Sequence, residues 1–246
     1  MAGAAPSTEV DPEMWRALAA KRFGDLPLDC HSTADPGLSD SEMWRDWAER
    51  ETTPDQLRIE DYLAAHDLRG RRILHIGLGN SSLARRFHSR AAEIVGTTVV
   101  PHEVELARSL ELANYRALLH NKYAAESDSL AGRFDFIVDN NPTTFCCCLA
   151  HLASMLEFYT AKLSEGGQLV TVRVGLGWAH IPEGNPRWGF DFEDLAAAGA
   201  AAGLTASRVD HNIYVLSREP LHPLPATSRL RWLANKVARR LARAWR

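Results

Sequence analysis

From residue 72 onwards, short apolar runs alternate with longer stretches of helical periodicity, and this alternation restricts the fold more than any other feature. Buried parallel strands joined by crossover helices produce such a pattern. We predict strands at 72–77, 93–99, 115–120, 134–139, 168–174, 205–210 and 213–218. The chain is therefore expected to form an α/β fold around one sheet.

The last two predicted strands are separated only by His211 and Asn212. Two residues are too few for a crossover, so these strands should form an antiparallel hairpin at the edge of the sheet. The sequence thus predicts a Rossmann-like, seven-stranded, mostly parallel sheet with an antiparallel last strand and flanking helices.

Three units are expected along the chain. Residues 1–68 have helical spacing, with Thr53 and Pro54 as a capped helix start, and they should form a helical N-terminal cap or a first layer. Residues 69–220 should form the Rossmann-like domain, and residues 221–246 a separate basic tail.

Composition excludes several classes of protein. The chain has no apolar stretch near the roughly 18 residues that a membrane span requires, and its start resembles neither a secretory signal nor an anchor. Of the four cysteines, three are adjacent at 146–148 and cannot form a sensible disulfide framework. We therefore expect a cytoplasmic protein with reduced thiols. Adjacent helical residues also point about 100° apart, so no metal site is predicted there.

The net charge of −3 hides an asymmetry, because residues 221–246 carry seven basic residues and no acidic one. The rest of the chain is therefore strongly acidic, which argues against nucleic-acid binding. The tail places apolar residues on one helical stripe, namely Leu230, Leu233, Val237, Leu241 and Trp245. Three partners remain open for this cationic amphipathic helix: its own acidic body, an anionic membrane surface and an acidic protein.

The first predicted strand runs into Gly77 and Gly79. Glycines two residues apart allow a tight turn and let a ligand approach the backbone closely. Ser81 and Ser82 follow at the expected helix start, where N-cap hydroxyls and exposed N–H groups favour an electron-rich ligand.

This segment resembles the first motif of the class I S-adenosylmethionine-dependent methyltransferases, a strand followed by acid-x-Gly-x-Gly-x-Gly. His75 stands at the position of the acid and Ser81 at the position of the third glycine. The resemblance extends over residues 70–218, because 134–142 resembles the fourth strand of that family and 163–172 the approach to the fifth. It implies S-adenosylmethionine as the cofactor.

The resemblance also implies a set of cofactor contacts. Thr98 stands where the family has the acid that binds the ribose hydroxyls. Its hydroxyl could make one bond, and His102 or Glu103 could reach the ribose as well. Asn121 matches a position that contacts the adenine amine, although it is equally an ordinary turn asparagine. The predicted cofactor-binding residues are His75, Gly77, Gly79, Asn80, Ser81, Ser82, Thr98, Val99, Asn121, Asp139 and Asn140.

Asp139, Asn140 and Asn141 lie at the end of the fourth predicted strand, on the edge where open α/β sheets bind ligands. Asn141-Pro142 resembles the Asn-Pro-Pro-aromatic motif of methyltransferases that act on nitrogen, with Thr143 in place of the second proline, or is a plain turn. His180 lies in the loop after the fifth strand and is a candidate general base. The predicted catalytic residues are His180, Asp139 and Asn141.

We therefore expect a methyltransferase that acts on an oxygen or nitrogen atom of a small molecule. The alternative is a methyltransferase-like protein with lost or changed activity, which the residues at 75, 81 and 98 favour. A nicotinamide-dependent enzyme is disfavoured, because the third glycine is missing and no acid or arginine follows about 20 residues later.

Overall fold

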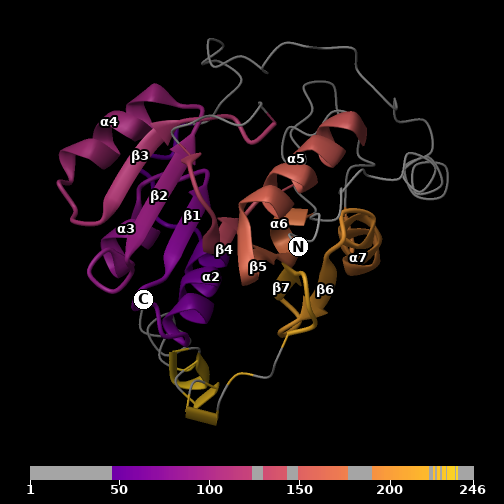
Figure 1. Ribbon diagram of the computed structural model, residues 1–246. Helices are drawn as coiled ribbons and strands as arrows, with labels where there is room; N and C mark the ends of the chain where they lie inside the picture. Colours follow the sequence, from indigo (N-terminus) through magenta and orange to yellow (C-terminus); the bar gives the residue numbers. More distant parts are fainter. Residues whose placement is uncertain are drawn as a thin grey trace, which may run out of the picture.

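The computed structural model describes residues 46–123, 130–142, 149–176 and 190–221, and in the tail 224, 226–227, 229–230, 232–235 and 237. The strands are β1 (Arg72–Ile76), β2 (Glu93–Thr98), β3 (Tyr115–Leu119), β4 (Phe134–Asp139), β5 (Leu163–Val172), β6 (Thr205–Arg208) and β7 (Ile213–Ser217). They form one sheet in the order β3-β2-β1-β4-β5-β7-β6 (Figure 1). The seven predicted strands are confirmed.

The pairing is parallel from β3 through β5, with Leu74 of β1 opposite Val95 of β2 and Ile137 of β4. β7 is antiparallel to both β5 and β6, which confirms the predicted hairpin at the sheet edge. The chain builds the sheet outward from β1 to β3 and then returns to place β4 on the other side of β1. This reversal opens a crevice at the carboxyl ends of β1 and β4.

Helices cover both faces of the sheet (Figure 1). They are α2 (Pro54–Ala64), α3 (Ser82–Phe87), α4 (Pro101–Ser109), α5 (Leu149–Lys162), α6 (Arg173–Leu176) and α7 (Phe192–Ala201). Side chains alternate between the faces along β1: Ile73 belongs to a core cluster with residues of α2 and α3, and Leu74 to a cluster with residues of α5 and α7. The result is a three-layer α/β sandwich.

α2 is a layer of this sandwich rather than an isolated element. It begins as predicted, with Pro54 in the first turn and the Thr53 hydroxyl accepting a hydrogen bond of 3.4 Å from the backbone N–H of Gln56. Its buried residues Ile59 and Leu63 pack on the sheet. Residues 1–45 of the predicted N-terminal unit lie outside the described residues.

The fifth strand ends earlier than predicted. Val172 is its last residue, and residues 173 and 174, which the sequence favours as strand, begin the short helix α6. The cause is a close approach at Gly175, where an added Cβ atom would stand 1.5 Å from the carbonyl oxygen of Asn140. The chain must therefore turn beside the end of β4, and only glycine permits this contact.

Within the part of the chain that the structure describes, no helix has the length and apolar character needed to cross a membrane.

Candidate functional site

A cavity of about 400 Å³ lies at the carboxyl ends of β1, β2 and β4 and extends to the first turn of α2. Most of the predicted site residues line it: His75, Gly77, Gly79, Asn80, Ser82, Thr98, Val99, Asn121, Asp139, Asn140 and Asn141. The fold therefore brings residues between positions 75 and 141 to one place, as expected for a crevice at a topological switch point. Their roles in binding and catalysis stay predictions.

The turn after β1 is held open by backbone conformation. Gly77 and Gly79 have φ angles of 72° and 49°, which side-chain-bearing residues rarely adopt. The N–H groups of Gly77 and Leu78 both donate to the carbonyl oxygen of Thr97, at 2.8 and 3.0 Å. An added Cβ atom at Gly77 would meet no atom within 4 Å. The wall of the cavity is therefore bare backbone at this point, and a ligand can approach it closely.

Ser81 is not part of the cavity lining, and its predicted N-cap role is wrong. Its φ angle of 60° turns the hydroxyl into the protein, where it shares a hydrogen bond of 2.9 Å with the Tyr115 hydroxyl, and no side-chain cap bond forms. Asn80 serves instead, because its Oδ1 atom accepts from the backbone N–H of Ser82 at 3.0 Å. The Asn80 side chain therefore caps the start of α3 in place of the Ser81 hydroxyl, because the left-handed backbone of Ser81 directs that hydroxyl toward Tyr115.

The segment before α2 closes over the turn that follows β1. The Asn80 amide donates to the carbonyl oxygen of Arg50 at 2.7 Å and to the Thr52 hydroxyl at 2.9 Å. Trp47 lies above Gly79, since an added Cβ atom there would stand 3.4 Å from the Trp47 Cβ. Sequence reasoning missed this segment, because no local pattern marks it as part of a site.

A buried carboxylate stands at the end of β2, although the strand itself ends in a neutral residue. The Thr98 hydroxyl donates a hydrogen bond of 2.6 Å to Oε2 of Glu103, in the first turn of α4. Oε1 of Glu103 accepts from the backbone N–H of Trp47 at 3.0 Å. Only 3% of Glu103 is exposed, and this burial raises the pKa of its carboxyl group. An acidic side chain therefore lines the cavity at the carboxyl end of β2.

His102, the other predicted substitute for the missing acid, faces away from the cavity. Its Nδ1 atom lies 2.5 Å from Oδ2 of Asp46, and the side chain is about half exposed. Adjacent helical residues point in different directions, so only one of His102 and Glu103 can face the strand end. Pro101 at the start of α4 is the signal that could have selected Glu103, because it fixes the helical phase.

Two further predicted cofactor contacts, Asn121 and His75, line the cavity and also belong to the folded framework around it. Asn121 lines the cavity and also makes a turn, since its Oδ1 accepts from the backbone N–H of Tyr123 at 3.0 Å. His75 lines the cavity but is buried, and burial lowers its pKa to about 4. A neutral imidazole therefore stands where the resembled family has an acid.

An ion pair organises the carboxyl end of β4. Oδ2 of Asp139 accepts from the Lys122 ammonium at 2.8 Å and from the Tyr159 hydroxyl, and Oδ1 accepts from the backbone N–H of Asn141 at 2.9 Å. Lys122 also donates to the carbonyl oxygens of Asn141 and Pro142, at 3.0 and 3.1 Å. Sequence reasoning missed Lys122, although its place beside Asn121 after the third strand indicated the same edge of the sheet.

Asn140 spans the gap between this edge and α2. Its Nδ2 atom donates to Oδ2 of Asp55 at 2.7 Å. Its Oδ1 atom is buried and has no hydrogen-bond partner among the described residues. A carboxylate only accepts, so Asp55 fixes the orientation of the amide and leaves the carbonyl oxygen as a buried acceptor.

Several predicted features fall outside the described residues. These are His180, Thr143 and the cysteines 146–148. Among the residues that are described, no group of three or more histidine, cysteine, aspartate or glutamate side chains is placed to hold a metal ion.

No protein-family model and no curated protein sequence matches this chain. Solved structures do match it. DesVI of Streptomyces venezuelae has a TM-score of 0.52 at 12% identity, over 68% of this chain and 93% of that one. The N-methyltransferase NodS of Bradyrhizobium japonicum WM9, in complex with S-adenosyl-L-homocysteine, has a TM-score of 0.51 at 15% identity, over 72% and 93%.

The amino pentose methyltransferase CalS10 of Micromonospora echinaspora, bound to S-adenosylmethionine, gives a TM-score of 0.50 at 16% identity and covers 69% of this chain and 93% of its own. Similarity at these identities concerns the fold. The sheet order and the antiparallel β7 agree with it. This chain has the fold of the class I S-adenosylmethionine-dependent methyltransferases.

Proposed function

We propose that this protein is an S-adenosylmethionine-dependent methyltransferase that acts on a small molecule and holds its cofactor in the cavity at the ends of β1, β2 and β4. The observation that carries the proposal is the open turn at Gly77, where bare backbone borders a cavity of about 400 Å³. Small-molecule pockets commonly have volumes of about 300 to 1,000 Å³, so an adenosyl group fits by size.

Glu103 is the residue that would bind the ribose hydroxyls. An ionised carboxylate has about four acceptor sites. Three are used by Thr98 and by the backbone N–H groups of Trp47 and Gly79, so that one remains for a ribose hydroxyl. The hydrogen bond from the Thr98 hydroxyl holds the carboxylate at the strand end, so Thr98 would act as a positioning residue.

Asn121 would contact the adenine, because it follows β3 on the same wall of the cavity. Its Oδ1 atom is engaged with Tyr123, which fixes the amide plane. The neutral His75 beneath the turn adds no charge near the sulfonium, which is consistent with a cationic cofactor.

Methyl transfer from a sulfonium releases a neutral thioether, so the protein must mainly align the acceptor and exclude water. Asn140 is placed for alignment, since it lines the cavity and the Asp55 carboxylate fixes the orientation of its amide. Lys122 and Asp139 hold the backbone of residues 141–142 beside it. We propose an oxygen or nitrogen atom of the small molecule as the methyl acceptor.

Two of the predicted catalytic residues, Asp139 and His180, are proposed to have different roles. Asp139 already accepts from the Lys122 ammonium and the Tyr159 hydroxyl, so it is better suited to organising the loop than to taking a proton from the substrate. His180 remains our proposal for the general base.

Titration calorimetry with S-adenosylmethionine, S-adenosyl-L-homocysteine and NAD tests the proposed function. We expect binding of the first two and none of NAD. Binding of NAD alone would favour the nicotinamide-dependent alternative. Absence of binding for all three would leave a protein that keeps the methyltransferase fold without its cofactor.

A further inference from the structure

The described part of the tail contacts the body through Trp232 and through the residues where the tail begins. The described residues between 226 and 237 have helical backbone. The Trp232 ring lies edge-on to the Tyr62 ring of α2, with the ring centroids 6.3 Å apart. Leu221 and Leu224, where the tail begins, are partly buried against the core cluster that contains α2. The tail helix thus has a defined inner side.

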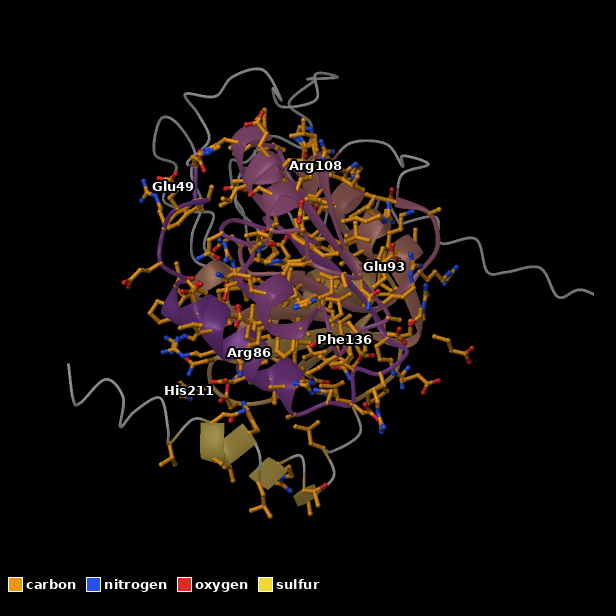
Figure 2. The ribbon with its side chains drawn as sticks, turned by 90° about the vertical axis from the view of Figure 1, so that its left-hand side faces the viewer. Glu49, Arg86, Glu93, Arg108, Phe136 and His211 are labelled. Carbon is orange, nitrogen blue, oxygen red and sulfur yellow. The ribbon has the colours of Figure 1, made fainter. Side chains whose placement is uncertain are left out.

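Its other side is apolar and exposed. Leu230, Leu233 and Val237 are spaced three and four residues apart and are 67%, 53% and 55% exposed. Several side chains of the described tail point away from the body in Figure 2. The sequence continues the spacing with Leu241 and Trp245. An apolar stripe of this kind in water is costly unless another surface covers it.

The charge pattern identifies the kind of surface. Residues 221–246 contain seven basic residues and no acidic one, whereas the chain as a whole has a net charge of −3. An anionic surface is therefore attracted to the tail and repelled by the body. Basic residues beside an apolar stripe are typical of helices that lie in the interface of an anionic membrane.

The described part of the tail and the cavity lie near opposite ends of α2. Tyr62 is near the end of α2, whereas Asp55 at its beginning lines the cavity. Their separation of seven positions corresponds to about 10 Å along the helix axis. Figure 1 shows the described part of the tail, in yellow, beyond the end of α2 and outside the sheet. A membrane in contact with the stripe would leave the cavity facing the aqueous side.

We propose that the tail binds an anionic lipid surface through the described helical residues between 226 and 237, with the exposed stripe of Leu230, Leu233 and Val237 inserted among the lipids. The basic side chains attract the lipid headgroups, and the stripe supplies the apolar burial. Trp232 remains against Tyr62 and fixes the orientation of the body. This association is independent of the cofactor, because no stripe residue lines the cavity.

Vesicle flotation of the full-length protein tests the proposal. We expect binding to vesicles of phosphatidylcholine mixed with phosphatidylglycerol, and little binding to phosphatidylcholine alone. The triple variant Leu230→Ser, Leu233→Ser, Val237→Ser keeps every charge and should lose at least about tenfold of the vesicle affinity. Leu119→Ser, at an exposed apolar residue of β3 that lines no part of the cavity, is the matched control and should bind vesicles as the wild type does.

The proposal fails if the wild-type protein does not float with phosphatidylglycerol vesicles, or if the triple variant floats equally well. It also fails if the wild type is a dimer that the triple variant converts to a monomer without loss of vesicle binding, because the stripe would then be a contact between two copies. Calorimetry of the triple variant with S-adenosylmethionine distinguishes failure of the membrane proposal from failure of the proposed function. The cofactor affinity of this variant should equal that of the wild type, because no stripe residue lines the cavity.

Discussion

The hydroxyl group of Thr98 lies 2.6 Å from Oε2 of Glu103, so a carboxylate from α4 stands at the end of a strand that itself ends without an acid. Burial of this pair raises the pKa of Glu103. A buried acid costs free energy in the unliganded protein unless hydrogen bonds compensate it. Such a cost is expected where a group is kept for ligand binding.

Replacement of Glu103 by glutamine should weaken binding of S-adenosylmethionine by about 10- to 100-fold, because a hydrogen bond to a charged acceptor contributes about 1.5–3 kcal/mol. Calorimetry at a pH above neutrality measures the change. Glu105→Gln is the matched control, since Glu105 lies on the same helix, is exposed and does not line the cavity. Equal affinity of Glu103→Gln and wild type would exclude Glu103 as the ribose ligand.

Binding of S-adenosylmethionine should also depend on pH through Glu103. The pKa of this carboxyl group is raised above 4.5, and only the ionised form presents all its acceptor sites. Affinity should therefore fall as pH decreases through the raised pKa, at a higher pH than an ordinary glutamate would titrate. Calorimetry over a pH series compares wild type with Glu103→Gln, whose profile should lack this step. Identical profiles would show that another group titrates.

Lys122→Met should destabilise the protein by about 2–4 kcal/mol, because it leaves the buried Asp139 without its cation. Denaturant unfolding measures this loss. The double variant Lys122→Met, Asp139→Asn removes both charges and should recover part of it. A double variant as unstable as the sum of the two single variants would show that the ion pair does not couple these residues.

Arg86 joins α3 to α2 through Glu60 and Asp61, at 3.4 and 3.0 Å. Arg86→Met should cost about 1–3 kcal/mol, a range reduced because the Arg86 side chain is about one third exposed. Burial raises the pKa of Glu60, so the ionised carboxylate destabilises the folded protein. This destabilisation is absent below the pKa of the unfolded state and is complete once pH has risen through the pKa of the folded state. The loss of stability in Arg86→Met should therefore become smaller as pH falls, because protonated Glu60 no longer needs a cation beside it. Arg69→Met, at an exposed pair with Asp67, is the control and should leave the stability of the protein close to that of the wild type at any pH.

The sheet could be predicted from the sequence because each of its buried strands is a distinct apolar run, as in 134–139, and because two residues between β6 and β7 permit only a hairpin. The start of α2 was predictable for a similar reason, since Thr53 and Pro54 act locally. Much of the cavity lining followed from the fold, because strand ends converge at a switch point.

The remaining details depend on contacts that no local pattern encodes. Ser81 and Asn80 exchange roles because a left-handed φ angle redirects the serine. β5 ends at Val172 because Gly175 packs on the backbone of Asn140. The ion pair between Lys122 and Asp139 spans 17 residues and exists only once β3 and β4 share one edge.

The most direct test of the account compares Gly77→Leu with Gly70→Leu by calorimetry with S-adenosylmethionine. The two glycines have φ angles of 72° and 73°, and an added Cβ atom at either would meet nothing within 4 Å, but only Gly77 lines the cavity. Backbone strain should therefore be alike in both variants. We predict that Gly77→Leu abolishes binding while Gly70→Leu binds as the wild type does. Wild-type affinity in Gly77→Leu would contradict the placement of the cofactor, and with it the proposed activity.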